Sequence, residues 1–175
     1  MDYIKNEEDI MKMWEKNEIF KKSLKQNINY KEFIHIQGPP FATGKMHYGH
    51  YLTETIKDII CRYKTMNKYY VERTANWDTH GLPIEYEIEK ELGIKTKEEI
   101  LKYGIENYNN KCSDIVMRCI DDWKFGLKRL GRWLDFDNQC KTMDINYMES
   151  LFWIFKQLFD KDLIYKGFKV MPYSN

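Results

Sequence analysis

Hydrophobic residues along most of this chain recur every three to four positions, which is the period of an α-helix. The spacing predicts helices over residues 6–26, 47–65, 83–92, 96–103, 105–130 and 144–160. Thr96 with Glu99 three positions later predicts a capping box at the start of one helix. Gly93 and Gly131 are natural helix ends.

Three short apolar runs interrupt this helical pattern, and they predict strands at 32–37, 69–71 and 163–173. Strands alternating with helices indicate a parallel sheet with right-handed crossovers. We therefore expect a helix-rich α/β fold with a Rossmann-like parallel sheet. Ligands bind at the carboxyl ends of such strands, and the unusual loops 38–50 and 74–84 each follow a predicted strand.

The composition is that of a globular protein without a strong charge field. The 175 residues are 43% hydrophobic and 31% charged, with a formal net charge of +1. This balance excludes a globally basic surface for nucleic acid. The polar, acidic start does not resemble a signal peptide, and no apolar run approaches the roughly 20 residues of a membrane helix. We expect a cytoplasmic protein that does not bind a membrane.

The four cysteines, Cys61, Cys112, Cys119 and Cys140, form no Cys-x-x-Cys pair. A structural zinc site is therefore not expected. Buried free thiols in a reducing compartment are the expectation.

The most informative segment is the loop Gly38–His50, which reads GPPFATGKMHYGH. A strand, a glycine-rich turn and a helix start form a phosphate site, because free N–H groups and the positive end of the helix point at the anion. Two imidazoles, His47 and His50, flank Gly49 at this helix start. Glycine is costly in a helix, and close backbone approach to a ligand is its usual reason.

Three other readings of this loop are weaker. A phosphate-binding P-loop would need its first glycine one residue closer to Gly44 and a hydroxyl in place of Met46. A zinc pair on a helix is spaced by four with a Glu between, whereas His47 and His50 are three apart. A structural role for both histidines leaves Gly49 unexplained.

The His47–His50 signature resembles the ATP site of class I aminoacyl-tRNA synthetases. The loop Trp77–Glu85, WDTHGLPIE, resembles the isoleucyl branch of that family, and so do the segments 108–110, 115–118, 129–133 and 169–174. The resemblance is closest to the eukaryotic cytosolic type and covers nearly the whole chain. Two departures are Lys45-Met46, where Leu-Pro is common, and Asn76, where Gly is usual.

The resemblance implies isoleucine activation by ATP, followed by transfer to tRNA. His47 and His50 would be catalytic, donating hydrogen bonds to phosphate, and Gly49 would let adenine lie on the backbone. The implied ATP-binding residues are Phe41, Ala42, Thr43, Gly44, His47, Gly49 and His50. Mg²⁺ would arrive with ATP, and no metal bound by protein side chains alone is implied.

The resemblance also implies an isoleucine pocket. Asp78 would pair with the α-ammonium group. Gly38 and Pro39 would shape the pocket wall, and Trp77 and His80 would complete it. Packing is an alternative for Trp77 and His80, and capping of the helix near Pro83 is an alternative for Asp78.

The implied organisation is an N-terminal helical extension at 1–30, followed by the first half of a Rossmann-like catalytic domain at 31–175. That half would end near the insertion point of an editing domain, and tRNA(Ile) would bind through the full-length enzyme. Two other functions stay open: a small nucleotidyltransferase with the same histidine signature, and a non-catalytic fragment or paralogue that serves as an interaction module.

The Lys-Met-Ser-Lys-Ser signature, whose lysines hold the leaving pyrophosphate in this family, does not occur in these 175 residues. We therefore expect no isoleucine-dependent ATP–pyrophosphate exchange from this chain alone. A radiolabelled pyrophosphate exchange assay tests this, and clear exchange with isoleucine would contradict it.

Overall fold

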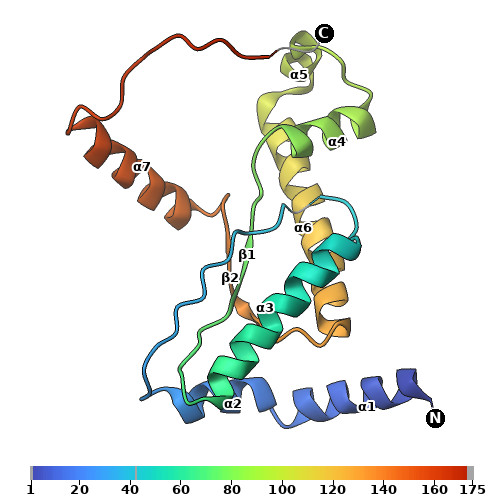
Figure 1. The fold of residues 1–175 in the computed structure, drawn as a ribbon. Coiled ribbons are helices and arrows are strands. Elements are labelled where there is room, and N and C mark those ends of the chain that lie inside the picture. The colour runs from blue at the N-terminus through green and yellow to red at the C-terminus, as the bar shows by residue number, and fades with distance from the viewer. Residues whose placement is uncertain (1, 42, 173–175) are drawn as a thin grey trace.

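The computed structural model describes residues 2–41 and 43–172, so Met1, Ala42 and the segment 173–175 lie outside the described residues. Seven helices and two strands make up this part of the chain (Figure 1). Their bounds are α1 Tyr3–Lys16, α2 Ile19–Asn27, α3 Tyr48–Met66, β1 Thr74–Trp77, α4 Leu82–Leu92, α5 Lys97–Tyr103, α6 Ile105–Arg129, β2 Asp135–Lys141 and α7 Ile145–Phe159.

The helix predictions are largely confirmed. The single helix expected at 6–26 is two helices, α1 and α2, because Glu18 between them has a left-handed backbone with φ 49°. The helices α3 to α7 begin and end within about two residues of their predicted positions. Thr96 and Glu99 form the predicted capping box at the start of α5.

The strand predictions are wrong in position. Residues 32–37 and 69–71 meet only in an isolated parallel bridge between Glu32 and Tyr70, and the described part of 163–173 contains no strand. The strands are instead β1, which was expected to be loop, and β2, which was not predicted. They pair in parallel, so a helix-rich α/β arrangement is confirmed with a two-stranded sheet.

The segment 32–41 runs beside β1 without forming a ladder along its length. Bridges join this segment to the chain on either side of β1, Glu32 to Tyr70 before the strand and Phe41 to Asp78 after it. Between these ends lies a small cavity of about 110 Å³, lined by residues of both segments. Ile34 and Ile36 are 71% and 89% exposed, so burial of their side chains does not hold this segment in place.

The hydrophobic core forms where α6 packs on β1. Val116, Ile120, Trp123 and Leu127 of α6 are almost fully buried. They meet the apolar residues of β1 together with Ile84 and Leu134. Burial of one such aliphatic side chain contributes about 1.5–3 kcal/mol, so α6 is the main support of the strand that leads into Asp78.

A buried ion network fastens α3 to the segment that follows α6. The Arg132 side chain is 0% exposed, and its guanidinium donates to Glu54 at 3.0 Å and to Asp58 at 3.1 Å. It also donates to the Gln37 side chain at 3.4 Å, so the network reaches the segment before the glycine-rich loop. Arg62 pairs with Asp58 and lies 3.8 Å from the centre of the Trp133 ring.

The helices α1 and α2 run past the end of the molecule where α3 and α6 finish (Figure 1). Trp14 and Phe20 contact the Trp133 ring with centroid distances of 5.3 and 6.0 Å. The buried Asn27 side chain donates to the carbonyl oxygens of Thr65 and Tyr69. These contacts join residues 1–30 to the body of the structure.

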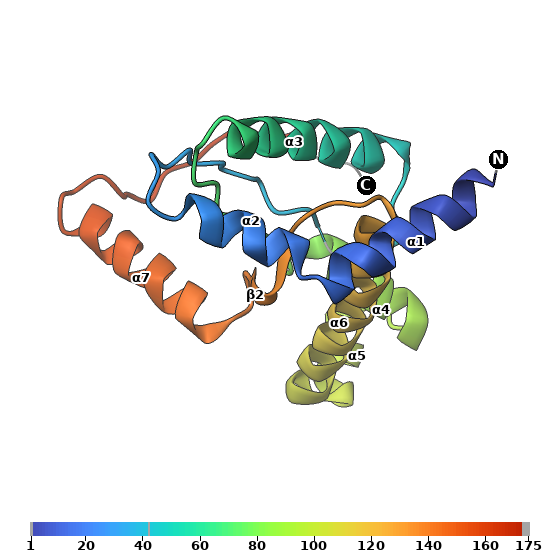
Figure 2. The ribbon, with the colours of Figure 1, turned by 90° about the horizontal axis from the view of Figure 1, so that it is seen from below.

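Two helices leave apolar faces uncovered. The apolar residues that recur at helical spacing along α3 are on the surface, with Leu52 63% and Ile59 60% exposed. Both views show α7 standing apart from the other helices, and its Phe152 and Trp153 are 71% and 63% exposed (Figures 1 and 2). Within the described residues, every helix is too short or too polar to span a bilayer.

Replacing Arg132 by Met should lower the free energy of unfolding by about 3 kcal/mol, because Glu54 and Asp58 would lose their most buried partner and keep only the less buried Lys57 and Arg62. Urea unfolding followed by circular dichroism measures this. The control is Arg129→Met, which breaks the more exposed pair with Glu7 and should cost about 1 kcal/mol or less. Equal costs for the two variants would contradict a dominant buried network.

Candidate active site

His47 and His50 form a reciprocal cap at the start of α3. His47 is the N-cap residue, and its Nδ1 accepts a hydrogen bond from the Gly49 N–H at 3.1 Å. The Nδ1 of His50 accepts from the His47 N–H at 3.2 Å. Two backbone donors at the positive end of a 19-residue helix are thus satisfied by imidazole nitrogens.

This cap selects the tautomer of both rings. A nitrogen that accepts a hydrogen bond carries no proton, so each neutral imidazole must hold its proton on Nε2. The backbone therefore prepares two Nε2–H donors at the start of α3. The His47 side chain is exposed and the His50 side chain is half-buried.

The two rings lie against each other and against the core. Their centroids are 3.6 Å apart with an interplanar angle of 23°, and the His50 ring contacts Trp123 with centroids 4.6 Å apart. Burial, with a smaller contribution from His47, lowers the pKa of His50 below its ordinary value of 6.5, and Glu54 opposes this shift. His50 is therefore mainly neutral at pH 7, as the acceptor role of its Nδ1 in the cap requires.

Gly49 is needed for the cap itself. A Cβ at this position would lie 3.0 Å from Cε1 and 3.1 Å from Nδ1 of His47, closer than nearly all real contacts. The missing side chain thus lets the His47 ring fold over the first turn of α3. This is a structural reason for the glycine that the sequence alone did not reveal.

The glycine-rich loop, Gly38–His50, is hydrogen-bonded directly to the loop Trp77–Glu85, which we call the acidic loop. The Asp78 N–H donates to the Pro40 carbonyl at 2.9 Å, and Phe41 forms a parallel bridge with Asp78. The two loops that the sequence singled out therefore meet at the carboxyl end of β1, a strand that lies within the segment predicted as the second loop.

The other predicted ATP residues lie along this loop. Phe41 packs on the core, and Thr43 donates its N–H to the Phe41 carbonyl. Gly44 has a left-handed backbone with φ 58°, which favours glycine. Ala42 lies outside the described residues.

The predicted isoleucine residues differ in exposure. Gly38 and Pro39 are exposed, Asp78 is half-buried and His80 is exposed. Trp77 is 1% exposed, belongs to the core and donates its indole N–H to the Gln139 side chain. Asp78 does not cap α4, because the N-cap is Gly81 and no side-chain cap is formed there.

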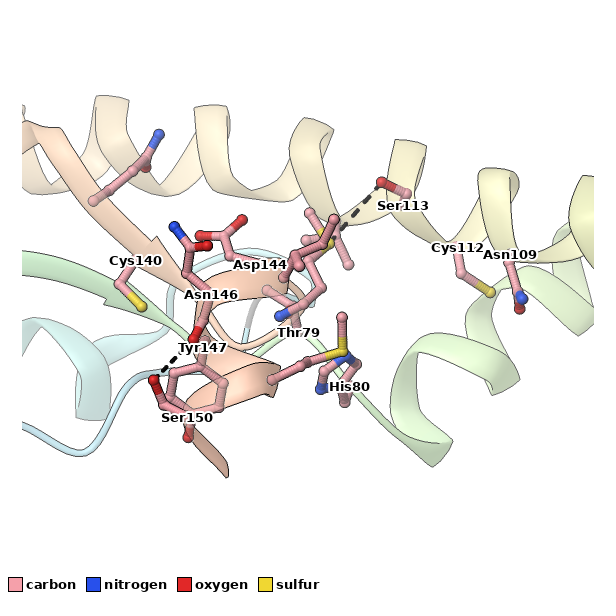
Figure 3. A pocket seen from close by; sticks show the side chains of 15 residues that line it. Thr79, His80, Asn109, Cys112, Ser113, Cys140, Asp144, Asn146, Tyr147 and Ser150 are labelled. Carbon is pink, nitrogen blue, oxygen red and sulfur yellow. Dashed lines mark hydrogen bonds between the residues drawn. The ribbon is translucent and has the colours of Figure 1, made fainter. Parts of the chain in front are cut away.

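His80 opens onto a second feature, a cleft of about 1160 Å³ beyond the carboxyl ends of β1 and β2. Figure 3 shows Asn109, Cys112 and Ser113 on its α6 side, with Asn146, Tyr147 and Ser150 from α7 across it. His47, His50 and Asp78 are not among its lining residues. Among the predicted site residues that the structure describes, His80 is thus the one that lines this cleft.

Sequence reasoning missed Thr79 and Thr142, which link the loops after β1 and β2. The Thr79 N–H donates to Thr142 Oγ1 at 2.9 Å, and the Thr79 hydroxyl accepts from the Met143 N–H. Because β2 was not predicted, nothing in the sequence placed Thr142 next to the acidic loop.

All four cysteines are free thiols, and Cys61 is buried. Burial raises the pKa of Cys61, Cys112 and Cys119, so these thiols stay protonated. Across the described part of the chain, His, Cys, Asp and Glu side chains do not gather in groups of three or more that could hold a metal ion.

Residues 9–175 match the family model of tRNA synthetases class I (I, L, M and V). The chain therefore belongs to this family of class I aminoacyl-tRNA synthetases, as its two loops predicted. Its fold resembles that of a leucyl enzyme, crystallised as the ternary complex of Agrobacterium radiobacter K84 agnB2 LeuRS, tRNA and LeuAMS. The TM-score is 0.68 at 22% identity, over 91% of this chain and 18% of that one.

Among curated relatives, the isoleucine–tRNA ligase of Tetrahymena thermophila is 52% identical over 99% of this chain. The cytoplasmic isoleucine–tRNA ligase of Saccharomyces cerevisiae is 54% identical over 97%, and the isoleucine–tRNA ligase of Treponema denticola is 50% identical over 99%. The chain spans 16% of the length of each of these three relatives. Because the last of them is bacterial, the identities do not single out a eukaryotic type.

Replacing Gly49 by Ala should displace the His47 ring and break the stacked pair, because the new methyl group meets Cε1 and Nδ1 of that ring. Long-range ¹⁵N–¹H NMR of the imidazoles should show changed nitrogen shifts for both histidines. The control is Gly38→Ala, where a Cβ meets no atom within 4 Å. Unchanged imidazole spectra in Gly49→Ala would refute this explanation of the glycine.

Proposed function

We propose that this chain supplies the ATP- and isoleucine-binding part of an isoleucine–tRNA ligase. The reaction would join isoleucine to the α-phosphorus of ATP with release of pyrophosphate, and then transfer the aminoacyl group to tRNA. The observation that carries the proposal is the hydrogen bond from the Asp78 N–H to the Pro40 carbonyl. This bond joins the glycine-rich loop, which leads to His47 and His50, to the acidic loop, which contains Asp78. The names of the relatives support isoleucine as the amino acid.

His47 and His50 would stabilise the negative charge that builds on the phosphate oxygens as the carboxylate attacks. Their Nε2–H groups are free of the capping bonds, which use Nδ1 in both rings. Donors that are already oriented do not reorganise during the reaction, which makes their stabilisation of the transition state effective. The positive end of α3 would add to this effect.

The loop residues would form the rest of the nucleotide site. Phe41, Ala42, Thr43 and Gly44 would border the ATP, and the backbone at Gly49 would receive adenine. Mg²⁺ would be carried by the phosphates of ATP, since phosphate oxygens are its preferred ligands in such sites.

Asp78 would hold the α-ammonium group of isoleucine. It is half-buried, so a bond between these two charges would be less screened than at a fully exposed position. Gly38 and Pro39 would form the wall of the pocket, with His80 at its edge. Trp77 would act from the core by fixing the strand that ends at Asp78.

The full-length ligase would bind tRNA(Ile) and work in the cytoplasm, as the name of the Saccharomyces cerevisiae relative states for that protein. The resemblance of the segments 108–110, 115–118, 129–133 and 169–174 supports the eukaryotic cytosolic type within the family. Residues 1–30 would be a helical extension of a catalytic domain that begins near residue 31.

Replacing Asp78 by Asn removes the charge and keeps the size of the side chain, and it should weaken isoleucine binding about tenfold or more. Titration of L-isoleucine into the ¹⁵N-labelled chain, followed by NMR, measures this affinity. The matched control is Glu85→Gln, which removes an exposed carboxylate in the first turn of α4. Equal isoleucine affinity in Asp78→Asn and the unchanged chain would reject this assignment, and no binding by either would favour a non-catalytic module.

A further inference from the structure

One face of α6 meets the glycine-rich loop at two positions. The Trp123 indole N–H donates to the Gly44 carbonyl at 3.0 Å. At Gly126, an added Cβ would lie 2.9 Å from the Met46 sulfur. Residues 123 and 126 are three apart, so they share one side of the helix.

Trp123 also contacts both halves of the site through its ring. It packs on the His50 imidazole with centroids 4.6 Å apart. It meets Trp77, the residue before Asp78, edge to face with centroids 6.2 Å apart. Trp123 is itself 1% exposed and anchored in the core, so these contacts start from a rigid support.

The loop needs such a support. Gly44 has a left-handed backbone, is exposed, and has open space where a Cβ would be, so packing does not hold it. The hydrogen bond to its carbonyl is one of the contacts that join the loop to the core. The glycine at 126 costs about 1 kcal/mol inside a helix, and the close approach of Met46 gives it a reason.

We propose that Trp123 is a positioning residue for the nucleotide site. It holds the Gly44 carbonyl and the His50 ring in place relative to β1, the strand that leads into Asp78. The expected effect on ATP affinity rests on the proposed function, since a loosened loop and a displaced His50 would weaken ATP binding. The contacts by which Trp123 holds Gly44 and His50 are present in the chain without ligand.

The test is Trp123→Phe, which keeps an aromatic ring in the core and removes the indole N–H. In the ligand-free chain, ¹⁵N relaxation of Gly44, Lys45 and Met46 should show increased fast motion. ATP affinity, measured by NMR titration, should fall about three- to tenfold, as expected for one lost hydrogen bond. The matched control is Leu127→Ala, one turn along α6 in the same core cluster. It should lower stability while leaving loop motion and ATP affinity unchanged.

A second variant covers the case in which Trp123→Phe does not fold. Gly126→Ala improves the helix propensity of α6, yet its methyl group would push Met46 away from the helix. Increased motion of the loop without loss of stability would support positioning. Unchanged relaxation in the variants that fold, or the same increase in Leu127→Ala, would overturn it. A more mobile loop in a chain that does not bind ATP at all would leave the positioning intact and reject the proposed function.

Discussion

The buried guanidinium of Arg132 is the constraint on which the arrangement of this chain depends. It pairs with Glu54 and Asp58, one helical turn apart on α3, from a position just after α6. Two helices that are distant in sequence are thereby fixed to each other by charges that would be costly to bury alone. Gln37 joins the same network, so the chain that enters the glycine-rich loop is held by it as well.

This constraint explains why the start of α3 can serve as a site although much of that helix is exposed. Its inner face is fastened by ions rather than by apolar packing, while Leu52 and Ile59 stay on the surface. The opposite wall of the site depends on apolar packing, since α6 supports β1 through Trp123 and Trp77. The start of α3, with its two histidines, is thus placed mainly by ion pairs, and Asp78 is placed mainly by apolar packing. The two parts of the site are joined at Pro40, whose carbonyl accepts a hydrogen bond from the Asp78 N–H.

Local sequence signals predicted the helices and both loops, because capping residues and helical spacing act over a few positions. The extent of α6 was predicted correctly from its spacing, but spacing alone did not single out Val116 and Ile120, which are 1% and 0% exposed on its buried face. The strand β2 could not be read in this way, because its sequence DFDNQCK has no apolar alternation and it forms through pairing with β1. The Trp123–Gly44 bond was equally hidden, since 79 residues separate its two partners.

The misplaced strand at 32–37 shows what periodicity can and cannot establish. Burial alternates there as in a strand, with Ile34 and Ile36 exposed and Phe33, His35 and Gln37 half-buried. The apolar run did not predict burial, since its two isoleucines lie on the exposed side. Hydrogen-bond pairing is a separate condition. Within 32–37 a bridge forms only between Glu32 and Tyr70, and the next one lies further along the chain, between Phe41 and Asp78. The pairing at Asp78 matters most for the site, because it joins the glycine-rich loop to the acidic loop. It does so although no continuous strand ladder precedes it.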